Sequence, residues 1–433
     1  MSVGLLRLRE DAARLRQGAL DKGEDPTAVD TAVDLDARRR ALLGEVEALR
    51  AALKAKSRAV GRSMKPGADG GGPETAALRV EGRDLGARIA DGERRLQGIE
   101  TELDEVMLRI PNPADPDVPI GGEDDGLIVR TWGDPAGHVR PDGSLVRPHW
   151  EVGETLGMLD LGAGAKVTGS GFPMYRGFGA ALQRALIDFM IGIHTREHGM
   201  IEIWPPALVN AASARGTGQI PDKEELMYVV TRDELYLVPT AEVPVTNIHR
   251  DEIIEADGLP IRYVAYSPCF RREAGAAGKE TRGILRVHQF DKVEMVCFER
   301  PADSSAALEW LTARAEVVLQ RLGLPYRVKL MATRDMGFVQ AKKYDLEVWA
   351  PGVERWLEVS SVSNFRDYQA QRMNIRWRPG PGAKPEVLHT LNGSGLALAR
   401  TVAAILEVYQ RADGTLAVPE ALRTQLGTDV VGV

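Results

Sequence analysis

The chain of 433 residues has little cysteine: only Cys269 and Cys297. Two thiols cannot build a disulfide framework or a cysteine-rich zinc site. The seven histidines are scattered along the chain, and they give no indication of a metal centre either. We interpret His288, in a strand-like stretch, as a structural histidine. We expect two reduced thiols in facing strands of a cytoplasmic protein.

Long apolar runs and net positive charge are also missing. No apolar run reaches the roughly 20 residues that a transmembrane helix needs, and charges interrupt the apolar residues of the first ten positions, unlike in a signal peptide. We therefore expect no membrane contact and a cytoplasmic location. The net charge of −7 by itself argues against a nucleic-acid-binding protein. The length suggests two or more domains with a sizeable core.

The basic residues are distributed unevenly. Between positions 36 and 65 there are nine basic residues but only three acidic ones, Asp36, Glu45 and Glu47. The nine are Arg38, Arg39, Arg40, Arg50, Lys54, Lys56, Arg58, Arg62 and Lys65. This local excess of positive charge is enough to attract phosphates to one element of an acidic protein.

Two long heptad patterns predict an antiparallel helical arm over residues 30–111, after a short amphipathic helix over 3–22. The first seam contains Leu35, Leu42, Val46, Leu49, Leu53 and Val60, with Arg39 and Lys56 at two seam positions. The second contains Leu78, Leu85, Ile89, Leu96, Ile99, Leu103, Val106 and Ile110, with Gly92 as a gap. A Gly/Pro-rich turn over 65–73 connects them. The first helix should be about 40 Å long. A dimerisation coiled coil is the alternative, but the basic bias favours an RNA-binding arm.

A proline-rich acidic stretch over 109–125 marks the domain boundary, so we expect an arm over 1–111 and a mixed domain over 112–433. In the second part, helices are expected at 178–197, 306–322 and 394–411. Strands are expected at 198–206, 235–238, 262–270, 285–298, 326–331, 344–350 and 356–361. The elements do not alternate regularly and hairpins dominate, which favours an α+β fold with an antiparallel sheet over a Rossmann sheet.

The stretch 262–297 predicts a β-hairpin with a long loop. Its second strand carries His288, Gln289, Asp291 and Glu294 among apolar residues. Polar groups in a sheet are costly unless they find partners, so this surface is predicted to face a ligand. The length of the loop also indicates function.

Three distant segments resemble motifs 2, 3 and 1 of the class II aminoacyl-tRNA synthetases. They are Phe270-Arg-Arg-Glu273 with its return strand, Asn392-Gly-Ser-Gly-Leu-Ala-Leu-Ala-Arg400, read as a turn into a helix, and Gly199-Met-Ile-Glu-Ile-Trp-Pro-Pro206. Four further strings resemble seryl-tRNA synthetase: Gly216-Thr-Gly-Gln219, Val238-Pro-Thr-Ala-Glu242, Glu358-Val-Ser-Ser361 followed by Asn364, and His389-Thr-Leu-Asn-Gly-Ser-Gly395. The resemblance covers essentially the whole chain, including the arm.

The resemblance implies a class II catalytic domain built on an antiparallel β-sheet flanked by helices. It implies a ligase that forms seryl-adenylate from L-serine and ATP and transfers the seryl group to tRNA-Ser, with tRNA-Sec as a further possible acceptor. Motif 1 implies a homodimer. Amino-acid activation requires positioning and charge neutralisation, for which arginines are suited. Arg271 resembles the arginine on the α-phosphate and the substrate carboxylate, and Arg400 the arginine on the γ-phosphate.

The same resemblance assigns the remaining site residues. For ATP it implies Arg271, Arg272, Glu273, Val287, Phe290, Glu358, Val359, Ser360, Ser361 and Arg400, with Glu273 reading adenine and Phe290 stacked under it. For serine it implies Thr240, Ala241, Glu242, Arg271, Glu294, Asn392 and Ser394. For Mg²⁺ it implies Glu358 and Ser361. The predicted tRNA contacts of the arm are Arg38, Arg39, Arg50, Lys54 and Arg58.

Three alternatives stay open at this point. An amino-acid ligase for a non-tRNA carrier would keep the chemistry but would have little use for a basic arm. A catalytically dead paralogue would bind RNA or protein through the arm, but Arg271, Glu358 and Arg400 are all present. A duplicated copy that confers antibiotic resistance would look the same in one sequence.

Overall fold

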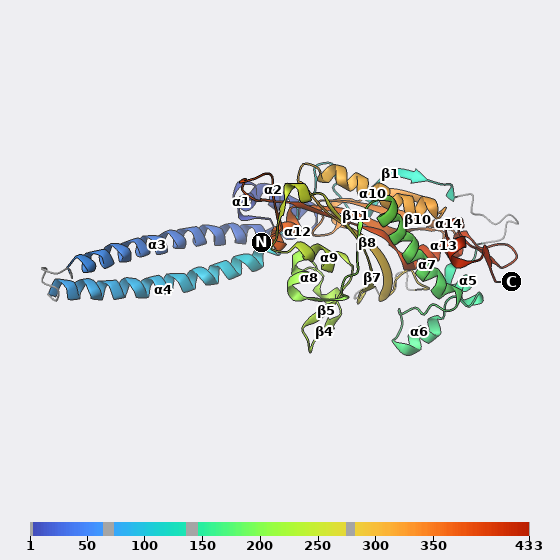
Figure 1. Cartoon of the computed structure of the whole chain (residues 1–433), viewed down its shortest axis with the longest axis horizontal. Coiled ribbons are helices and arrows are strands. Elements are labelled where there is room, and N and C mark those ends of the chain that lie inside the picture. The colour runs from blue at the N-terminus through green and yellow to red at the C-terminus, as the bar shows by residue number, and fades with distance from the viewer. Residues whose placement is uncertain (1–2, 64–72, 136–145, 274–281, 433) are drawn as a thin grey trace. The chain divides into compact units, whose positions relative to one another are not determined.

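The computed structural model describes residues 3–63, 73–135, 146–273 and 282–432. The expected turn over 65–73 therefore lies almost entirely outside the described residues. The chain divides into two compact units. One comprises residues 1–20 and 24–111, and the other comprises residues 21–23 and 112–433 (Figure 1).

The described residues of the first unit form the helices α1 (Leu5–Glu10), α2 (Ala12–Asp21), α3 (Thr27–Ser63) and α4 (Pro73–Met107). The single helix expected over 3–22 is two helices, because the backbone leaves the helical region at Asp11 (φ −135°, ψ 30°). Helix α3 is 37 residues long, which corresponds to about 55 Å. The expected 40 Å was too short because the helix begins earlier than the first seam residue.

The seam between α3 and α4 follows the predicted heptads. Leu42, Val46 and Ile89 are buried, and Leu49, Leu53, Leu96 and Ile99 pack around them. The gap at Gly92 lies where the two helices approach closely, since a Cβ there would be 2.7 Å from Val46 Cγ2. The basic seam residues are paired across the hairpin: Arg39 Nε donates to Glu100 Oε1 at 2.9 Å, and Lys56 forms an ion pair with Glu81.

The second unit is built on an eight-stranded sheet, in which every neighbouring pair is antiparallel except β2 and β7. The strands, in spatial order, are β1 (Leu127–Trp132), β9 (Tyr326–Leu330), β10 (Lys342–Ala350), β11 (Arg355–Arg366), β14 (His389–Ala397), β8 (Gln289–Glu299), β7 (Ile261–Phe270) and β2 (Ile201–Ile203). The predicted antiparallel α+β fold is confirmed.

Helices cover both faces of this sheet. In the described part of the unit, the helices are α5 (His149–Thr155), α6 (Leu161–Val167), α7 (Phe178–Gly192, continued by a π-helical turn, Ile193–Glu197), α8 (Ala211–Thr217), α9 (Glu242–Thr246), α10 (Ser304–Arg321), α11 (Thr333–Met336), α12 (Tyr368–Met373), α13 (Leu398–Val408) and α14 (Glu420–Leu426). Because successive residues of a strand point to opposite faces, Val293 and Met295 of β8 join the large core with α7, α10 and α13. Val296 and Phe298 pack instead with residues of α9 and α12.

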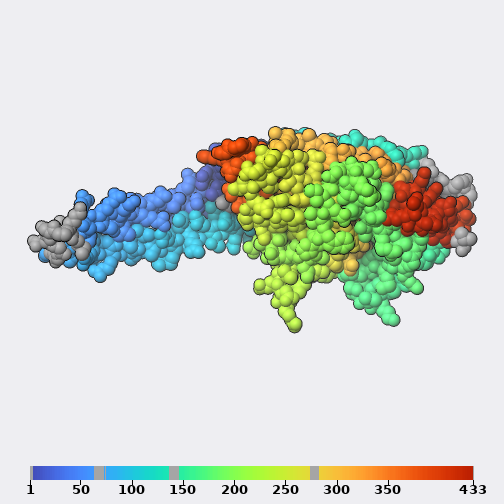
Figure 2. Space-filling model, viewed as in Figure 1, coloured from blue at the N-terminus to red at the C-terminus, as the bar shows by residue number. Residues whose placement is uncertain are grey.

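Three small sheets complete the unit. They comprise β3 (Leu208–Asn210), β5 (Leu235–Leu237) and β4 (Val229–Val230); β13 (Glu386–Val387), β12 (Arg376–Arg378) and β6 (Ile253–Glu255); and β15 (Leu416–Ala417) with β16 (Val430–Val431). The β3–β5–β4 sheet and α6 form two separate projections in the space-filling view (Figure 2).

Several predicted boundaries were wrong. The strand expected over 198–206 is regular only over Ile201–Ile203, and the strand expected over 356–361 extends over Arg355–Arg366. Residues 394–397 are not helical: they end β14, and α13 begins only at Leu398. The glycines that suggested a turn mark close approaches within a central strand, since a Cβ at Gly395 would lie 2.7 Å from His194 Nε2. The expected strand over 285–298 begins only at Gln289.

The two cysteines are free and buried, Cys269 on β7 and Cys297 on β8, as the sequence suggested. The hairpin of β7 and β8 is also confirmed, with Val264 opposite Met295. In the described part of the chain, no helix has both the length and the apolar character needed to cross a membrane.

Candidate active site

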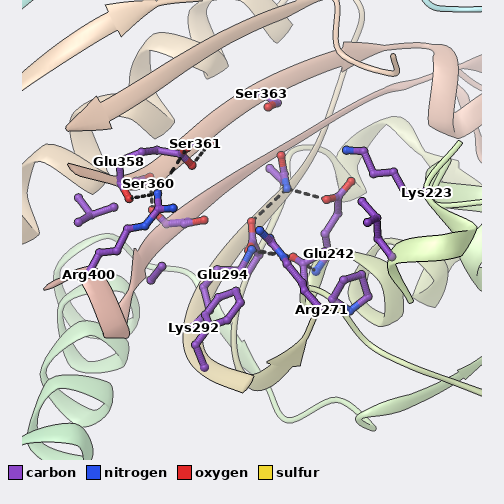
Figure 3. A pocket seen from close by; sticks show the side chains of 18 of the residues that line it. Lys223, Glu242, Arg271, Lys292, Glu294, Glu358, Ser360, Ser361, Ser363 and Arg400 are labelled. Carbon is purple, nitrogen blue, oxygen red and sulfur yellow. Dashed lines mark hydrogen bonds and ion pairs between the residues drawn. The ribbon is translucent and has the colours of Figure 1, made fainter. Parts of the chain in front are cut away.

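A cavity of about 550 Å³ opens on the second unit, over strands β8, β11 and β14 (Figure 3). Its lining includes charged or polar side chains from segments far apart in the sequence: Lys223, Thr240, Glu242, Arg271, Glu273, Arg286, Lys292, Glu294, Lys343, Glu358, Ser361, Asn392, Ser394 and Arg400. Glu294 follows the alternation of β8, so it lies on the same face as Val296 and Phe298, toward α9. Of the four polar residues on which the ligand-facing surface was predicted, only Glu294 lines this cavity, and His288, Gln289 and Asp291 do not.

Two carboxylates lie at the buried end of this cavity. Glu242 opens α9, Glu294 lies on β8, and both are nearly inaccessible. Asn392 of β14 bridges them, because its Nδ2 donates to Glu242 Oε2 at 2.9 Å and to Glu294 Oε1 at 3.0 Å. Thr240 Oγ1 donates to Glu294 Oε2 at 3.0 Å. Lys292, two residues before Glu294, forms an ion pair with it.

Among the residues that the structure describes, none forms a salt bridge with Glu242, and Lys223 and Lys292 act on it only at longer range. Gln369 Nε2 donates to its Oε1 at 2.6 Å, and Thr390 Oγ1 fixes that amide by donating to Gln369 Oε1 at 2.8 Å. Burial and the negative charge of Glu294 raise the pKa of Glu242 to about 7. This carboxyl is therefore poised to gain charge when a cation enters the cavity.

Two arginines also line the cavity. Arg271 follows β7 directly, and its guanidinium carbon lies 5.1 Å from the centre of the Phe290 ring. Arg400, in the first turn of α13, donates from Nε to Leu285 O and from Nη1 to Glu358 O, each at 2.9 Å. The expected convergence of the two guanidinium groups on one crevice is confirmed, with Glu294 at its buried end.

The third cluster is Glu358 and Ser361 on β11. Ser361 Oγ donates to Glu358 Oε1 at 2.9 Å, and Arg400 Nη1 lies 3.8 Å from Glu358 Oε2. The Glu358 side chain is 44% exposed. Desolvation opposes its ionisation, but Lys343, Arg400 and the Ser361 hydroxyl outweigh that effect and hold the pKa of Glu358 well below its usual range. Among the described residues, no group of three or more His, Cys, Asp or Glu side chains could hold a metal.

Comparison with known proteins decides the family. The "Seryl-tRNA synthetase N-terminal domain" matches residues 5–114, and the "tRNA synthetase class II core domain (G, H, P, S and T)" matches residues 228–409. The serine–tRNA ligase of Gemmatimonas aurantiaca is 50% identical over 98% of this chain and 98% of its own length. The chain belongs to the seryl-tRNA synthetase family.

Two solved seryl-tRNA synthetases have the same fold. The enzyme from Pyrococcus horikoshii, complexed with ATP, superimposes with a TM-score of 0.92 at 35% identity and covers 99% of each chain. The cytoplasmic enzyme from Naegleria fowleri, in complex with AMP, gives a TM-score of 0.87 at 29% identity, covering 99% of this chain and 98% of the other. As a member of the seryl-tRNA synthetase family, the chain is an aminoacyl-tRNA ligase.

Most residues that the resemblance assigned to seryl-tRNA synthetase chemistry line the cavity, but two do not. Arg272 is exposed, and its Nη1 donates to Glu225 O at 3.0 Å. Ala241 is fully buried at the start of α9. Ser360 lines the cavity, but its hydroxyl already donates to Ser394 O at 2.6 Å. Nearby, Glu273 Oε2 accepts from Arg286 Nε at 2.6 Å.

The sequence interpretation missed several cations that line this cavity: Lys223, Arg286, Lys292 and Lys343. Lys292 could have been found, because it shares a strand face with Glu294 two residues later. Arg286 lies outside the regular strand that was expected to contain it. His288, expected in a strand, lies just before β8; its ring stacks on Phe172 and its Nδ1 lies 3.0 Å from Arg271 O, contacts that agree with the structural role we expect for it.

In the arm, most of the predicted tRNA-binding residues are paired with carboxylates. Arg50 Nη2 lies 2.6 Å from Glu93 Oε1, Arg38 Nη1 lies 3.5 Å from Asp34 Oδ2, and Arg39 is paired with Glu100 as described above. Lys54 and Arg58 are exposed and take part in no salt bridge with the residues that the structure describes. These two side chains carry the least compensated positive charge of the predicted set.

Proposed function

We propose that the cavity over β8, β11 and β14 is where serine and ATP react, with each substrate held by a different group of side chains. The chain is a serine–tRNA ligase: it charges tRNA with serine at the expense of ATP. The observation that carries the site assignment is that Arg271 and Arg400 line the same cavity as the buried carboxylates Glu242 and Glu294.

Serine is assigned to the buried end. Lys292 already balances Glu294, so Glu242 is the carboxylate left to pair with the substrate ammonium. Glu294, Asn392 and Ser394 offer hydrogen bonds to the hydroxyl, and Thr240 supports Glu294. A site built to bond a hydroxyl rejects alanine strongly, because its buried polar groups would be left without partners.

ATP is assigned to the end with the arginines. Arg271 stands where it can contact both the serine carboxylate and the α-phosphate, and Arg400 is assigned to the γ-phosphate. Glu273 and Phe290 are assigned to adenine. The carboxylate oxygen of serine bonds to the α-phosphorus while the bond from that phosphorus to the bridging oxygen breaks. Pyrophosphate leaves with the bonding electrons, and the two guanidinium groups stabilise the charge that develops.

Mg²⁺ fits Glu358 and Ser361. Both supply oxygen, the donor that this ion prefers, and the lowered pKa keeps the carboxylate ionised. Two protein ligands leave room for water and phosphate, as is typical of magnesium bound with a nucleotide. When bound, the ion would supply positive charge to neutralise the phosphates.

For the second step, the basic face of α3 is assigned to tRNA-Ser, because it concentrates the positive charge of an acidic chain. We also infer a homodimer through the edge strand β2, where Ile201 is 59% exposed and Trp204, which follows the strand, is 77% exposed. Measurement of the molar mass in solution tests this dimer. We infer a cytoplasmic enzyme from its reduced, buried cysteines.

The test of the activity is pyrophosphate exchange into ATP with a panel of amino acids, followed by aminoacylation of tRNA-Ser. Exchange that depends on serine and is at least about a hundredfold weaker with alanine supports the proposal. Equal exchange with alanine, or none with serine, rules it out. Replacement of Arg271 by Lys should abolish most of the exchange, since lysine cannot form the bidentate contact.

A further inference from the structure

A buried histidine and glutamate lie behind the nucleotide end of the cavity, and neither lines it. His149 opens α5 and is fully buried, and Glu407 lies near the end of α13, two turns after Arg400. His149 Nδ1 is 2.7 Å from Glu407 Oε1. Neither residue lines the cavity, but Glu407 lies on the helix that carries Arg400, and His149 is bonded to it.

The Glu407 carboxylate is saturated by N–H donors. Oε1 accepts from the His149 backbone at 3.0 Å and from its ring, and Oε2 accepts from the backbones of Gly352 and Val353 at 2.8 and 3.2 Å. A buried carboxylate with four donors is well satisfied and holds its neighbours in fixed positions. It thereby ties α5 and the turn between β10 and β11 to α13.

The hydrogen bond at the other ring nitrogen of His149, Nε2, determines the tautomer of the ring. The backbone N–H of Ile284 donates to Nε2 at 3.1 Å, so Nε2 carries no proton and Nδ1 donates to Glu407. Ile284 is fully buried. If Nε2 were removed, this N–H would lose its partner in a place that water does not easily reach.

The segment that contacts His149 is the one that approaches the cavity. Gly283 has a φ of +73°, and a Cβ there would lie 2.2 Å from His149 Nε2. The guanidinium carbon of Arg282 is 4.8 Å from the centre of the Trp150 ring. Leu285 O then accepts from Arg400 Nε, and Arg286 pairs with Glu273. The segment 282–286 is thus fastened to α13 twice, directly at Arg400 and through His149 at Glu407.

We propose that His149 is a positioning residue for the ATP end of the site, fixing the segment 282–286 against α13 through the chain Glu407–His149–Ile284. This rests on the proposed assignment of Arg400 and Glu273 to the nucleotide, Glu273 being the partner of Arg286. The serine end is supported by other residues, so disturbing His149 weakens ATP binding and leaves serine recognition unchanged.

Two variants separate the bonds of the ring. In His149→Asn the amide nitrogen takes the place of Nδ1 and still donates to Glu407, but the acceptor for Ile284 is lost. In His149→Gln the longer side chain brings an oxygen toward the Nε2 position and restores that acceptor. Gly283→Ala disturbs the contact between His149 and Ile284 from the side of the segment, because its methyl group would press against the imidazole ring.

The experiment measures the Kd of ATP by calorimetry and the KM values of ATP and serine in pyrophosphate exchange. We expect His149→Asn and Gly283→Ala to weaken ATP binding about five- to tenfold, with the KM of serine unchanged. His149→Gln should recover only part of the loss, because it restores the acceptor for Ile284 but not the donor to Glu407. His249→Asn is the matched control, because His249 also pairs with a glutamate, Glu252, at 2.7 Å but does not line the cavity. It should lower the melting temperature only.

The inference is overturned if His149→Asn binds ATP like the wild type, if its serine and ATP constants change equally, or if it behaves like His249→Asn. Should His149→Asn fail to fold, Gly283→Ala decides in the same way. Failure of the proposed function is recognised separately, as absence of serine-dependent exchange in the wild type. The calorimetric Kd still tests the positioning role in that case.

Discussion

Glu242 and Glu294 approach the same amide nitrogen, since Asn392 Nδ2 lies 2.9 Å from one carboxylate and 3.0 Å from the other. An amide nitrogen has two hydrogens, and here both are used. Asn392 therefore bridges two carboxylates that would otherwise repel each other, and it fixes the positions of the groups assigned to the ammonium and the hydroxyl of serine.

Replacing this amide tests its role. In Asn392→Asp a third carboxylate replaces the donor, so both glutamates lose a hydrogen bond and gain a like charge. We expect serine-dependent exchange to fall at least about a hundredfold, mainly through the KM of serine, while the Kd of ATP is unchanged. Steady-state kinetics and calorimetry measure these effects. A normal KM for serine would contradict the bridging role.

A pH dependence follows from Glu242. Its pKa in the folded protein is about 7, above the ordinary value of 4.5. Because the shift is upward, the stability that neutral Glu242 gives is fully present below about pH 4.5 and is lost as the pH rises through 7. Serine affinity has the opposite trend, since only the ionised carboxylate pairs with an ammonium group.

We therefore expect serine to bind more tightly as the pH rises through about 7, while the free enzyme loses stability over the range from 4.5 to 7. Serine titrations and melting curves across this range measure both effects. Glu242→Gln should bind serine weakly at every pH and should lose this component of the stability profile. If Glu242→Gln kept the serine profile of the wild type, another group would be responsible.

Magnesium dependence tests Glu358. Glu358→Gln keeps the size of the side chain but removes the charge, and a hard cation prefers a carboxylate. We expect the magnesium concentration for half-maximal exchange to rise about tenfold or more, with serine binding unchanged. Ser363→Ala is a suitable control, because Ser363 also lines the cavity on β11. An unchanged magnesium requirement in Glu358→Gln would remove Glu358 as a ligand.

The sequence predicted the parts of this protein that depend on local pattern. Heptads predicted the helical arm, and β-branched and aromatic runs predicted the β7–β8 hairpin. Local pattern could not show that Gly393 and Gly395 lie in a central strand. Glycine is needed there because Val362 of β11 lies close to Gly393 and His194 lies close to Gly395, and neither group is a neighbour in sequence. The same is true of the buried histidine at 149, whose partners lie far away in sequence.

The site could be predicted mainly through the resemblance. Arg271 lies in the segment that resembles motif 2 and Arg400 in the segment that resembles motif 3, and both residues line the cavity. Gln369, which orients Glu242, gave no signal, because it lies on α12 and meets Glu242 only in the folded chain. The contact between Gln369 and Glu242 is a tertiary one, and the periodicity of apolar residues along the sequence does not predict such contacts.

The last prediction concerns the arm. Lys54 and Arg58 are one turn apart on α3, exposed, and not in salt bridges with described residues, whereas Arg39 and Arg50 are compensated by Glu100 and Glu93. Charge that is already compensated attracts phosphate less strongly. We therefore expect the double variant Lys54→Ala/Arg58→Ala to raise the KM of tRNA-Ser about tenfold or more and to lower the slope of log Kd against log salt by about two.

Exchange in the absence of tRNA should be unchanged in this variant, since it needs only the catalytic unit. Arg94→Ala is the matched control: it removes one cation from α4, where it pairs with Asp91. Filter binding at several salt concentrations measures the slope. If Arg94→Ala weakened tRNA binding as much as the double variant, the attraction would come from the whole arm, and the basic face of α3 would have no special part in it.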